Sequence, residues 1–155
     1  MKIAVMSDIH SNIYALEAVL DDIKNRDIDL VACTGDLVGY GTRPNEVINT
    51  IRKNRILTIM GNYDDAIGNF KLVCGCDYKD PKDAEKASLS MHFTSMETTD
   101  ENKKYLSSLP KEATTKMNML STPVCMEWRF NVHPSPILIY LYYINSIFIS
   151  HYMTI

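Results

Sequence analysis

Residues 1–10, MKIAVMSDIH, decide how the rest of this sequence is interpreted. Lys2–Met6 is apolar after its first residue and partly β-branched, which is typical of a β-strand. The apolar run is too short for a signal peptide. A carboxylate and an imidazole, Asp8 and His10, follow almost at once. We therefore expect a first strand that delivers two polar side chains at its carboxyl end.

The same arrangement occurs twice more along the chain. The apolar segments Leu30–Cys33 and Ile56–Met60 are predicted strands, and polar residues follow them at Asp36 and Asn62. Apolar residues at helical spacing lie between the strands, and Pro44 fits the first turn of the second helix. This alternation predicts a β-α-β-α-β array, which is an α/β fold with a parallel sheet.

Two further helices are predicted at Ala84–Met96 and Glu101–Leu109. Near the end of the chain, Ile137–Ile149 is apolar but shorter than the ~20 residues that a membrane-spanning helix needs. Its content of Ile, Tyr and Phe favours two β-strands instead. We expect no association with a membrane.

The composition is that of an ordinary globular chain. A length of 155 residues with 46% hydrophobic residues accommodates one hydrophobic core, so we expect a single domain over residues 1–155. The net charge of −3, with no basic block, argues against general nucleic-acid binding. Four cysteines in a chain of this size do not make a disulfide framework, which predicts reduced thiols and a cytoplasmic location.

The composition changes abruptly after residue 115. All glycines lie before this point, and the only charged residues after it are Lys116, Glu127 and Arg129. We therefore distinguish residues 1–115 from an atypical tail, residues 116–155. The change suggests a shifted reading frame or a truncated gene. DNA without an alternative frame that restores a glycine–histidine motif after residue 115 would exclude this hypothesis.

Ligands of open α/β sheets bind at the carboxyl ends of the strands. The three predicted strands end there in Asp8 and His10, in Asp36 and in Asn62. Mixed oxygen and nitrogen donors suit Mn, Fe, Zn or Mg, and the lack of thiolates argues against a structural zinc site. A single aspartate after a strand is often only a helix N-cap. That alternative must hold at all four positions to remove the site.

Three short motifs, Asp8-Ile9-His10, Gly35-Asp36 and Gly61-Asn62-Tyr63-Asp64, resemble the first three motifs of the calcineurin-like metallophosphoesterases. In that family the motifs are D-x-H, G-D and G-N-H-D/E. The segment from Asp36 to Gly41 and the loop from Cys74 to Pro81 are also similar to its small phosphodiesterase-like members. The resemblance covers residues 1–115 and implies an α/β fold in which helices flank a β-sandwich.

The resemblance also implies a site with two divalent metal ions, drawn from Mn, Fe, Zn, Ni and Mg. Asp8 and His10 would bind the first ion, Asp36 would bridge both ions, and Asn62 would bind the second. Such a pair of ions lowers the pKa of a bound water and clamps the oxygens of an in-line displacement. The implied activity is hydrolysis of a small phosphate ester, more specifically a phosphodiester, by a metal-activated hydroxide.

Tyr63 and Asp64 are the candidates for a catalytic role on the substrate side of the metals or behind the metal ligands. Tyr63 replaces the family's common histidine, and a tyrosine with a pKa of about 10 is a poor proton shuttle at neutral pH. Asp64 would orient neighbouring groups or cap the following helix. Cys74 and Cys76 have no second pair of cysteines, so they predict a loop pair near the pocket mouth rather than a metal or redox site.

The tail departs from the family. Complete members supply three further histidines from V-H-G-x-P-like and G-H-T-H-like segments, but no glycine follows Gly75 here. His133 is the nearest candidate ligand, and His151 is a weaker one. The missing ligands favour an alternative function, a catalytically weak or inactive remnant that binds a divalent metal or a phosphate ligand. A plain α/β binding module is a third hypothesis, although the sequence has no glycine-rich phosphate loop.

Overall fold

A computed structural model describes the chain except for residues 1, 77, 114–119, 122–137, 144–148 and 155, and from residue 113 onward it describes the backbone alone. The described part has a mixed α/β fold, which confirms the predicted fold class. Its elements are β1 (Lys2–Ser7), α1 (Ile13–Lys24), β2 (Leu30–Cys33), α2 (Pro44–Lys53), β3 (Leu57–Thr58), α3 (Asn62–Gly68), α4 (Pro81–Glu97), α5 (Asp100–Ser108), β4 (Glu112–Ala113), β5 (Leu120–Ser121), β6 (Leu138–Tyr143) and β7 (Ile149–Thr154).

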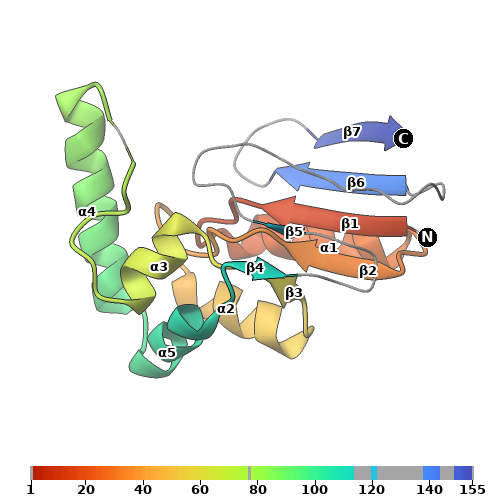
Figure 1. Cartoon of the computed structure of the whole chain (residues 1–155), viewed down its shortest axis with the longest axis horizontal. Helices are drawn as coiled ribbons and strands as arrows, with labels where there is room; N and C mark the ends of the chain where they lie inside the picture. Colours follow the sequence, from red (N-terminus) through yellow and green to blue (C-terminus); the bar gives the residue numbers. More distant parts are fainter. Residues whose placement is uncertain (1, 77, 114–119, 122–137, 144–148, 155) are drawn as a thin grey trace.

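The main sheet has the strand order β3-β2-β1-β6-β7. β1 runs parallel to β2 and to β6, β2 runs parallel to β3, and β7 is antiparallel to β6. β4 and β5 form a separate antiparallel pair. In Figure 1 the arrowheads of β1 and β6 point toward the side on which α3 and α4 lie. The carboxyl ends of the parallel strands therefore meet on that side of the molecule.

The hydrophobic core lies around β1, which is the central strand. Ala4, Val5 and Met6 are buried, as expected for a strand with a paired neighbour on each side. In α2 the predicted inward positions Val47, Ile48 and Ile51 are fully buried, and their spacing places them on one face of the helix. Each such side chain contributes roughly 1.5–3 kcal/mol through the burial of its apolar surface.

Two elements differ from their predicted bounds. β3 is shorter than the predicted Ile56–Met60: beyond it the amide of Ile59 still donates to the carbonyl of Cys33 at the end of β2, and the amide of Met60 donates to the carbonyl of Pro110, 2.8 Å away. α4 begins at Pro81, earlier than predicted, because the side chain of Asp80 accepts a hydrogen bond from the amide of Lys82 and caps the helix.

The two strands predicted in the tail are both present, but the second one lies later than predicted. β6 falls inside the predicted apolar stretch, whereas β7 begins at Ile149, where that stretch ends. β6 extends the sheet by pairing with β1. His151 lies on β7, and His133 lies outside the described residues. No helix in the part of the chain that the structure describes is long and apolar enough to cross a membrane.

The loops that follow β2 and β3 pack backbone against backbone. A Cβ atom at Gly35 would lie 2.3 Å from the amide nitrogen of Gly61, and a Cβ at Gly61 would lie 2.2 Å from the amide nitrogen of Asp36. Real Cβ atoms do not come this close to other heavy atoms, so both positions require glycine. These contacts hold Asp36 and Asn62, the residues after the two glycines, in neighbouring loops.

Replacing Gly35 by alanine is expected to lower the free energy of unfolding by about 3 kcal/mol or more, because the new methyl group overlaps the Gly61 backbone and φ is +99°. Gly75 is the matched control. Its φ is +83°, but nothing lies within 4 Å of an added Cβ, so alanine there should cost only about 1–2 kcal/mol. Urea unfolding of both variants checks this prediction, and equal losses would contradict it.

Candidate metal centre

The loop after β1 and the loop after β2 run side by side. The backbone amide of His10 donates to the carbonyl of Asp36 over 2.9 Å, and the amide of Ser11 donates to the carbonyl of Leu37 over 2.8 Å. These hydrogen bonds continue the pairing of the two parallel strands beyond their ends. The side chains that leave the two loops are therefore held close together.

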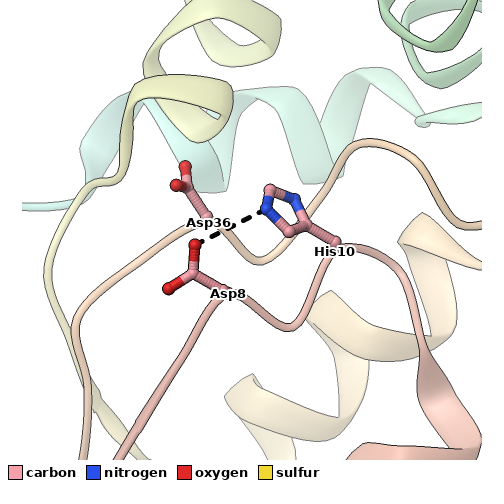
Figure 2. A group of neighbouring side chains, drawn as sticks. All are labelled: Asp8, His10 and Asp36. Atoms are coloured by element: carbon pink, nitrogen blue, oxygen red, sulfur yellow. Dashed lines mark ion pairs between the residues drawn. The ribbon is translucent and has the colours of Figure 1, made fainter. Parts of the chain in front are cut away.

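Asp8, His10 and Asp36 form one cluster, shown in Figure 2. One ligand atom from each lies within 4.8 Å of the ligand atoms of the other two. Within the cluster, Nε2 of His10 lies 3.6 Å from Oδ1 of Asp8. His10 is only 8% exposed, whereas the side chain of Asp8 is 42% exposed. The cluster is thus anchored in the protein on one side and open to solvent on the other.

The ring of His10 is oriented by a backbone carbonyl. Its Nδ1 lies 2.8 Å from the carbonyl oxygen of Val38, an oxygen that can only accept a hydrogen bond, so Nδ1 carries the proton. Nε2 faces Asp8, to which it donates when the ring is protonated, and in the neutral ring Nε2 is the nitrogen with the free lone pair that a metal ion can bind. An imidazole whose other nitrogen donates to a carbonyl is the usual arrangement of a metal-binding histidine.

The donor set and its dimensions fit a divalent metal ion. An ion bound at roughly 2.0–2.2 Å holds neighbouring ligands about 3 Å apart and opposite ligands about 4 Å apart. The cluster is only slightly wider than this, because its ligand atoms lie within 4.8 Å of one another. Small side-chain rotations of Asp8 and Asp36 therefore suffice to close it around an ion.

The carboxylate of Asp36 is fixed by the start of α3. Its Oδ1 accepts a hydrogen bond from the backbone amide of Tyr63 over 2.9 Å. The other oxygen and the remaining lone pairs stay available for ligands. A carboxylate held in this way can bind two cations at once, which a neutral side chain cannot do.

Asn62 is the first residue of α3 and precedes the residue that holds Asp36. Its Nδ2 donates to the carbonyl of Cys74 and to the sulfur of Cys76, each at 3.1 Å. Both hydrogen bonds use the amide nitrogen, so Oδ1 is the atom that a metal ion can bind. The structure thus places Asn62 next in sequence to the residue whose amide holds Asp36, with its side chain oriented by the loop before α4.

Asp64 is fully buried and binds two backbone amides. Its Oδ1 accepts from the amide of Leu37 and its Oδ2 accepts from the amide of Gly61, both over 2.9 Å. The amide of Leu37 belongs to the loop after β2, and Gly61 is the N-cap residue of α3. Asp64 therefore ties the two loops together from behind, and both of its oxygens are already used by the protein.

Tyr63 supports the ring of His10 from the protein interior. It is 2% exposed, and its ring centre lies 5.3 Å from that of His10 in an edge-to-face arrangement. Its hydroxyl lies 3.2 Å from the hydroxyl of Tyr78, which in turn lies 2.6 Å from that of Tyr40. Burial is the main cause that raises the pKa of Tyr63, so its hydroxyl stays protonated at neutral pH.

Several residues at the cluster have backbone angles that L-amino acids rarely adopt. φ is positive at Asp8 (57°), His10 (46°), Ser11 (58°) and Asp36 (54°). These values lie in the left-handed helical region, where Asp and His are tolerated better than most residues. Such strained positions gather at functional sites, where the surrounding structure holds the backbone in place.

The acidic groups and the histidine influence one another's pKa values. The hydrogen bond with His10 is the main cause that holds the pKa of Asp8 below its usual value. Burial alone lowers the pKa of His10, but its contacts with Asp8 and with the Val38 carbonyl outweigh burial and raise it. Burial raises the pKa of Asp36. A metal ion must therefore compete with protons for this cluster.

Without a metal ion, the stability of the chain should fall as the pH rises from about 4 to about 7. Burial, followed by the nearby charge of Asp36, raises the pKa of Asp64 to about 7, although hydrogen bonds from the backbone amides of Gly61, Leu37 and Asp36 lower it. With Asp36 also raised, the folded chain holds more protons than the unfolded chain in this window, so stability decreases by on the order of a few kcal/mol. The raised pKa of His10 also makes stability fall with pH near neutrality. The lowered pKa of Asp8 affects stability only at pH values below the ordinary pKa of an aspartate.

Urea unfolding in a chelator at pH 5 and at pH 7.5 checks this prediction. Excess Mn²⁺ should reverse the slope, because deprotonated ligands bind the ion more tightly. A metal-free chain that becomes more stable over the same interval would contradict the assignment of buried, proton-holding carboxylates.

The structure brings together Asp8, His10 and Asp36, and Asn62 directly precedes the residue whose amide binds Asp36. The role of all four residues as metal ligands stays a prediction. His133 lies outside the described residues. Two contacts of the site were not predicted from the sequence: the one between His10 and the carbonyl of Val38, and the one of Asn62 with Cys74 and Cys76. The first depends on a backbone group, which has no signal in the sequence. The cysteine contact depends on the path of a loop that motif spacing does not define.

Residues 1–123 match the model of the calcineurin-like phosphoesterase family. Over 109 residues the chain is 44% identical to an uncharacterized protein of Methanocaldococcus jannaschii. The aligned region covers 70% of this chain and 42% of that protein. The match extends somewhat beyond residue 115, where the composition changes.

Two solved structures have a similar fold. A metallophosphoesterase from Sphaerobacter thermophilus is 34% identical with a TM-score of 0.54, over 72% of this chain and 42% of that one. A hypothetical protein from Pyrococcus horikoshii is 27% identical with a TM-score of 0.60, over 76% and 51% of the two chains. The chain thus spans about two fifths to one half of the length of these relatives. The matched motifs, the fold and the family model agree: the chain belongs to the calcineurin-like phosphoesterase family.

Proposed function

We propose that the chain is a phosphoesterase that hydrolyses small phosphodiesters with two divalent metal ions, held by Asp8, His10, Asp36 and Asn62. Family membership supports a phosphoric ester hydrolase that uses divalent metals. The diester, the second ion and manganese as the metal are our more specific proposals. We also propose a cytoplasmic location, because Cys33, Cys74 and Cys76 are free thiols.

The observation that carries this proposal is the cluster of Asp8, His10 and Asp36, whose ligand atoms lie within 4.8 Å of one another. Asp8 and Asp36 are 28 residues apart in the sequence. The capping of helices does not explain why two carboxylates and one oriented imidazole gather at one partly exposed position. His10 in particular has no capping role, since its Nδ1 binds the Val38 carbonyl. This arrangement favours a metal site over a set of unrelated N-caps.

The residues of the chain would divide the work as follows. Divalent ions supply the Lewis acidity that activates water and offsets the charge of the phosphate. Asp36 would lie between the two ions, since Tyr63 holds only one of its oxygens. Asn62 would offer a neutral oxygen, which leaves the second ion more electrophilic than a carboxylate does.

We propose that Tyr63 and Asp64 orient the metal ligands and do not bind the metal ions themselves. The hydroxyl of Tyr63 is bonded to Tyr78 and its ring packs against His10, which supports a role in orienting that ring rather than in transferring a proton. Both oxygens of Asp64 are occupied by backbone amides, which supports a role in holding the loop of Asp36. His133 is retained as a proposed additional ligand.

A second candidate function is a remnant that binds one metal ion or a phosphate ligand without turnover. It is favoured by the set of metal-binding groups: among the residues that the structure describes, only Asp8, His10 and Asp36 form a cluster of three such side chains.

The full chain, stripped of metal with a chelator, is assayed with bis(p-nitrophenyl) phosphate and with p-nitrophenyl phosphate, with and without Mn²⁺. We expect hydrolysis that depends on the metal and is faster for the diester. Elemental analysis is expected to give two ions per chain. Binding of one ion, or of inorganic phosphate, with no turnover of either ester would favour the remnant. A chain that binds neither an ion nor inorganic phosphate would exclude both candidates.

A further inference from the structure

Cys74 and Cys76 form a pair of thiols in the loop between α3 and α4. Their sulfur atoms lie 2.9 Å apart, and both thiols are free. Cys74 is half-buried and packs against the core, whereas Cys76 is exposed. Gly75 between them has φ of +83° with open space beside it, a backbone conformation that lets both side chains turn to the same side.

This pair is joined to the candidate metal centre through Asn62. The amide of Asn62 donates to the sulfur of Cys76 and to the carbonyl of Cys74. On the other side, the hydroxyl of Tyr78 lies 3.9 Å from the sulfur of Cys74 and 3.2 Å from the hydroxyl of Tyr63. A change in the bonding of the two sulfurs therefore reaches a proposed metal ligand directly.

A second metal site at the cysteines is disfavoured. Structural zinc sites use four protein ligands, and their cysteines come in company with further cysteines or histidines. In the described ranges of the chain, no group of three His, Cys, Asp or Glu side chains that could hold an ion includes Cys74 or Cys76. The two sulfurs do meet the requirement for joining to each other, because they already face one another.

We propose that Cys74 and Cys76 are a reversible dithiol–disulfide site that reacts with small disulfides such as oxidised glutathione. The thiolate of the more exposed Cys76 attacks one sulfur of the oxidant, forms a mixed disulfide and releases one glutathione thiolate. The sulfur of Cys74 then attacks the Cys76 sulfur of the mixed disulfide and releases the second glutathione thiolate. Two protein thiols are oxidised, one small disulfide is reduced to two thiols, and the two protons go to the released thiolates.

Oxidation has a consequence for Asn62, which rests on the proposed function of that residue. The Cys76 sulfur moves toward Cys74 and becomes a poorer acceptor, so the amide of Asn62 loses one of its two orienting hydrogen bonds. Partners that orient metal ligands typically change metal affinity by about 10- to 100-fold. We expect the oxidised chain to bind Mn²⁺ about tenfold more weakly than the reduced chain.

The test uses oxidised glutathione and peptide mass spectrometry on the full chain. Cleavage after Lys71 and Lys79 gives the peptide LVCGCDYK, residues 72–79, which contains neither of the other two cysteines. Because burial raises the pKa of the Cys76 thiol, the incubation is carried out at mildly alkaline pH. The peptide should become lighter by two hydrogen atoms, and a dithiol reductant should restore its mass.

Cys74→Ser and Cys76→Ser are the matched variants. In each, the remaining thiol should stop at a glutathione adduct, since its partner sulfur is missing. A wild-type peptide that carries stable glutathione adducts on both cysteines, or stays unmodified, would overturn the proposal. The buried Cys33 should remain unmodified under the same conditions and reports whether the chain is still folded.

Titration with Mn²⁺ before and after oxidation separates this inference from the proposed function. A disulfide that forms without a change in affinity would overturn the link to Asn62 only. A chain that binds no Mn²⁺ in either state would overturn the proposed function, while the peptide masses still decide on the disulfide. In Cys76→Ser the affinity should no longer respond to oxidised glutathione.

Discussion

Asp36→Asn is expected to lower the rate of metal-dependent phosphodiester hydrolysis by at least about a hundredfold. Asparagine has the same shape and can still accept the hydrogen bond from the amide of Tyr63, but it has only one oxygen and no charge. A bridging carboxylate and its ions account for several kcal/mol of charge stabilisation, and each 1.36 kcal/mol corresponds to a factor of ten in rate. The measurement is the initial rate with bis(p-nitrophenyl) phosphate and Mn²⁺.

A thermal unfolding experiment distinguishes a damaged site from a damaged fold. Asp36→Asn removes a carboxylate whose pKa is raised by burial, so the metal-free variant should melt no lower than the metal-free wild type. Mn²⁺ should raise the melting temperature of the wild type but not that of the variant. Asp21→Asn is the control for the loss of one negative charge, because Asp21 lies on α1 with a 74% exposed side chain. Comparable rates for Asp36→Asn and Asp21→Asn would contradict the bridging role.

Asp64→Ala should be the most destabilising substitution among the site residues. It leaves the backbone amides of Leu37 and Gly61 buried without an acceptor. An unsatisfied buried polar group costs about 1–3 kcal/mol, so we expect a total loss of about 3–5 kcal/mol in the free energy of unfolding. That is a large share of the 5–15 kcal/mol typical of a folded domain.

Asp65→Ala is the matched control for this prediction, since it removes the neighbouring carboxylate of the same helix. Asp65 binds Lys71 and Asn69 at the surface, and such interactions contribute up to about 1 kcal/mol. Asp64→Asn keeps one acceptor oxygen and should fall between the two. Urea unfolding at a single pH measures all three variants, and similar losses for Asp64→Ala and Asp65→Ala would show that the buried hydrogen bonds contribute little.

The sequence predicted the framework of the site because that framework is local. A strand that ends in a polar loop can be recognised from a few consecutive residues, as at Asp8 and at Asp36, and the alternation of helices and strands implies that the strands are parallel. Parallel strands bring their carboxyl ends to one edge of the sheet. The meeting of Asp8, His10 and Asp36 follows from these two steps, and the structure shows it.

Contacts between loops could not be predicted in the same way. The carbonyl that binds the amide of Met60 belongs to Pro110, which lies 50 residues further along the chain. The two acceptor contacts of Asp64 depend on how the loop after β2 folds back on α3. The orientation of Asn62 depends on the cysteine loop. Each of these is a pairing between distant backbone groups, which neither hydrophobic spacing nor a short motif determines.

The positive φ values at Asp8, His10, Ser11 and Asp36 bear on how an ion would be captured. Each residue in the left-handed region lowers the stability of the folded chain by on the order of 1–2 kcal/mol. This free-energy cost arises when the chain folds, before an ion binds. Ion capture then needs little further ordering of the polypeptide, so its entropic penalty is small. The metal-free chain is therefore less stable than it would be without these backbone conformations, but its ion-binding site is already formed.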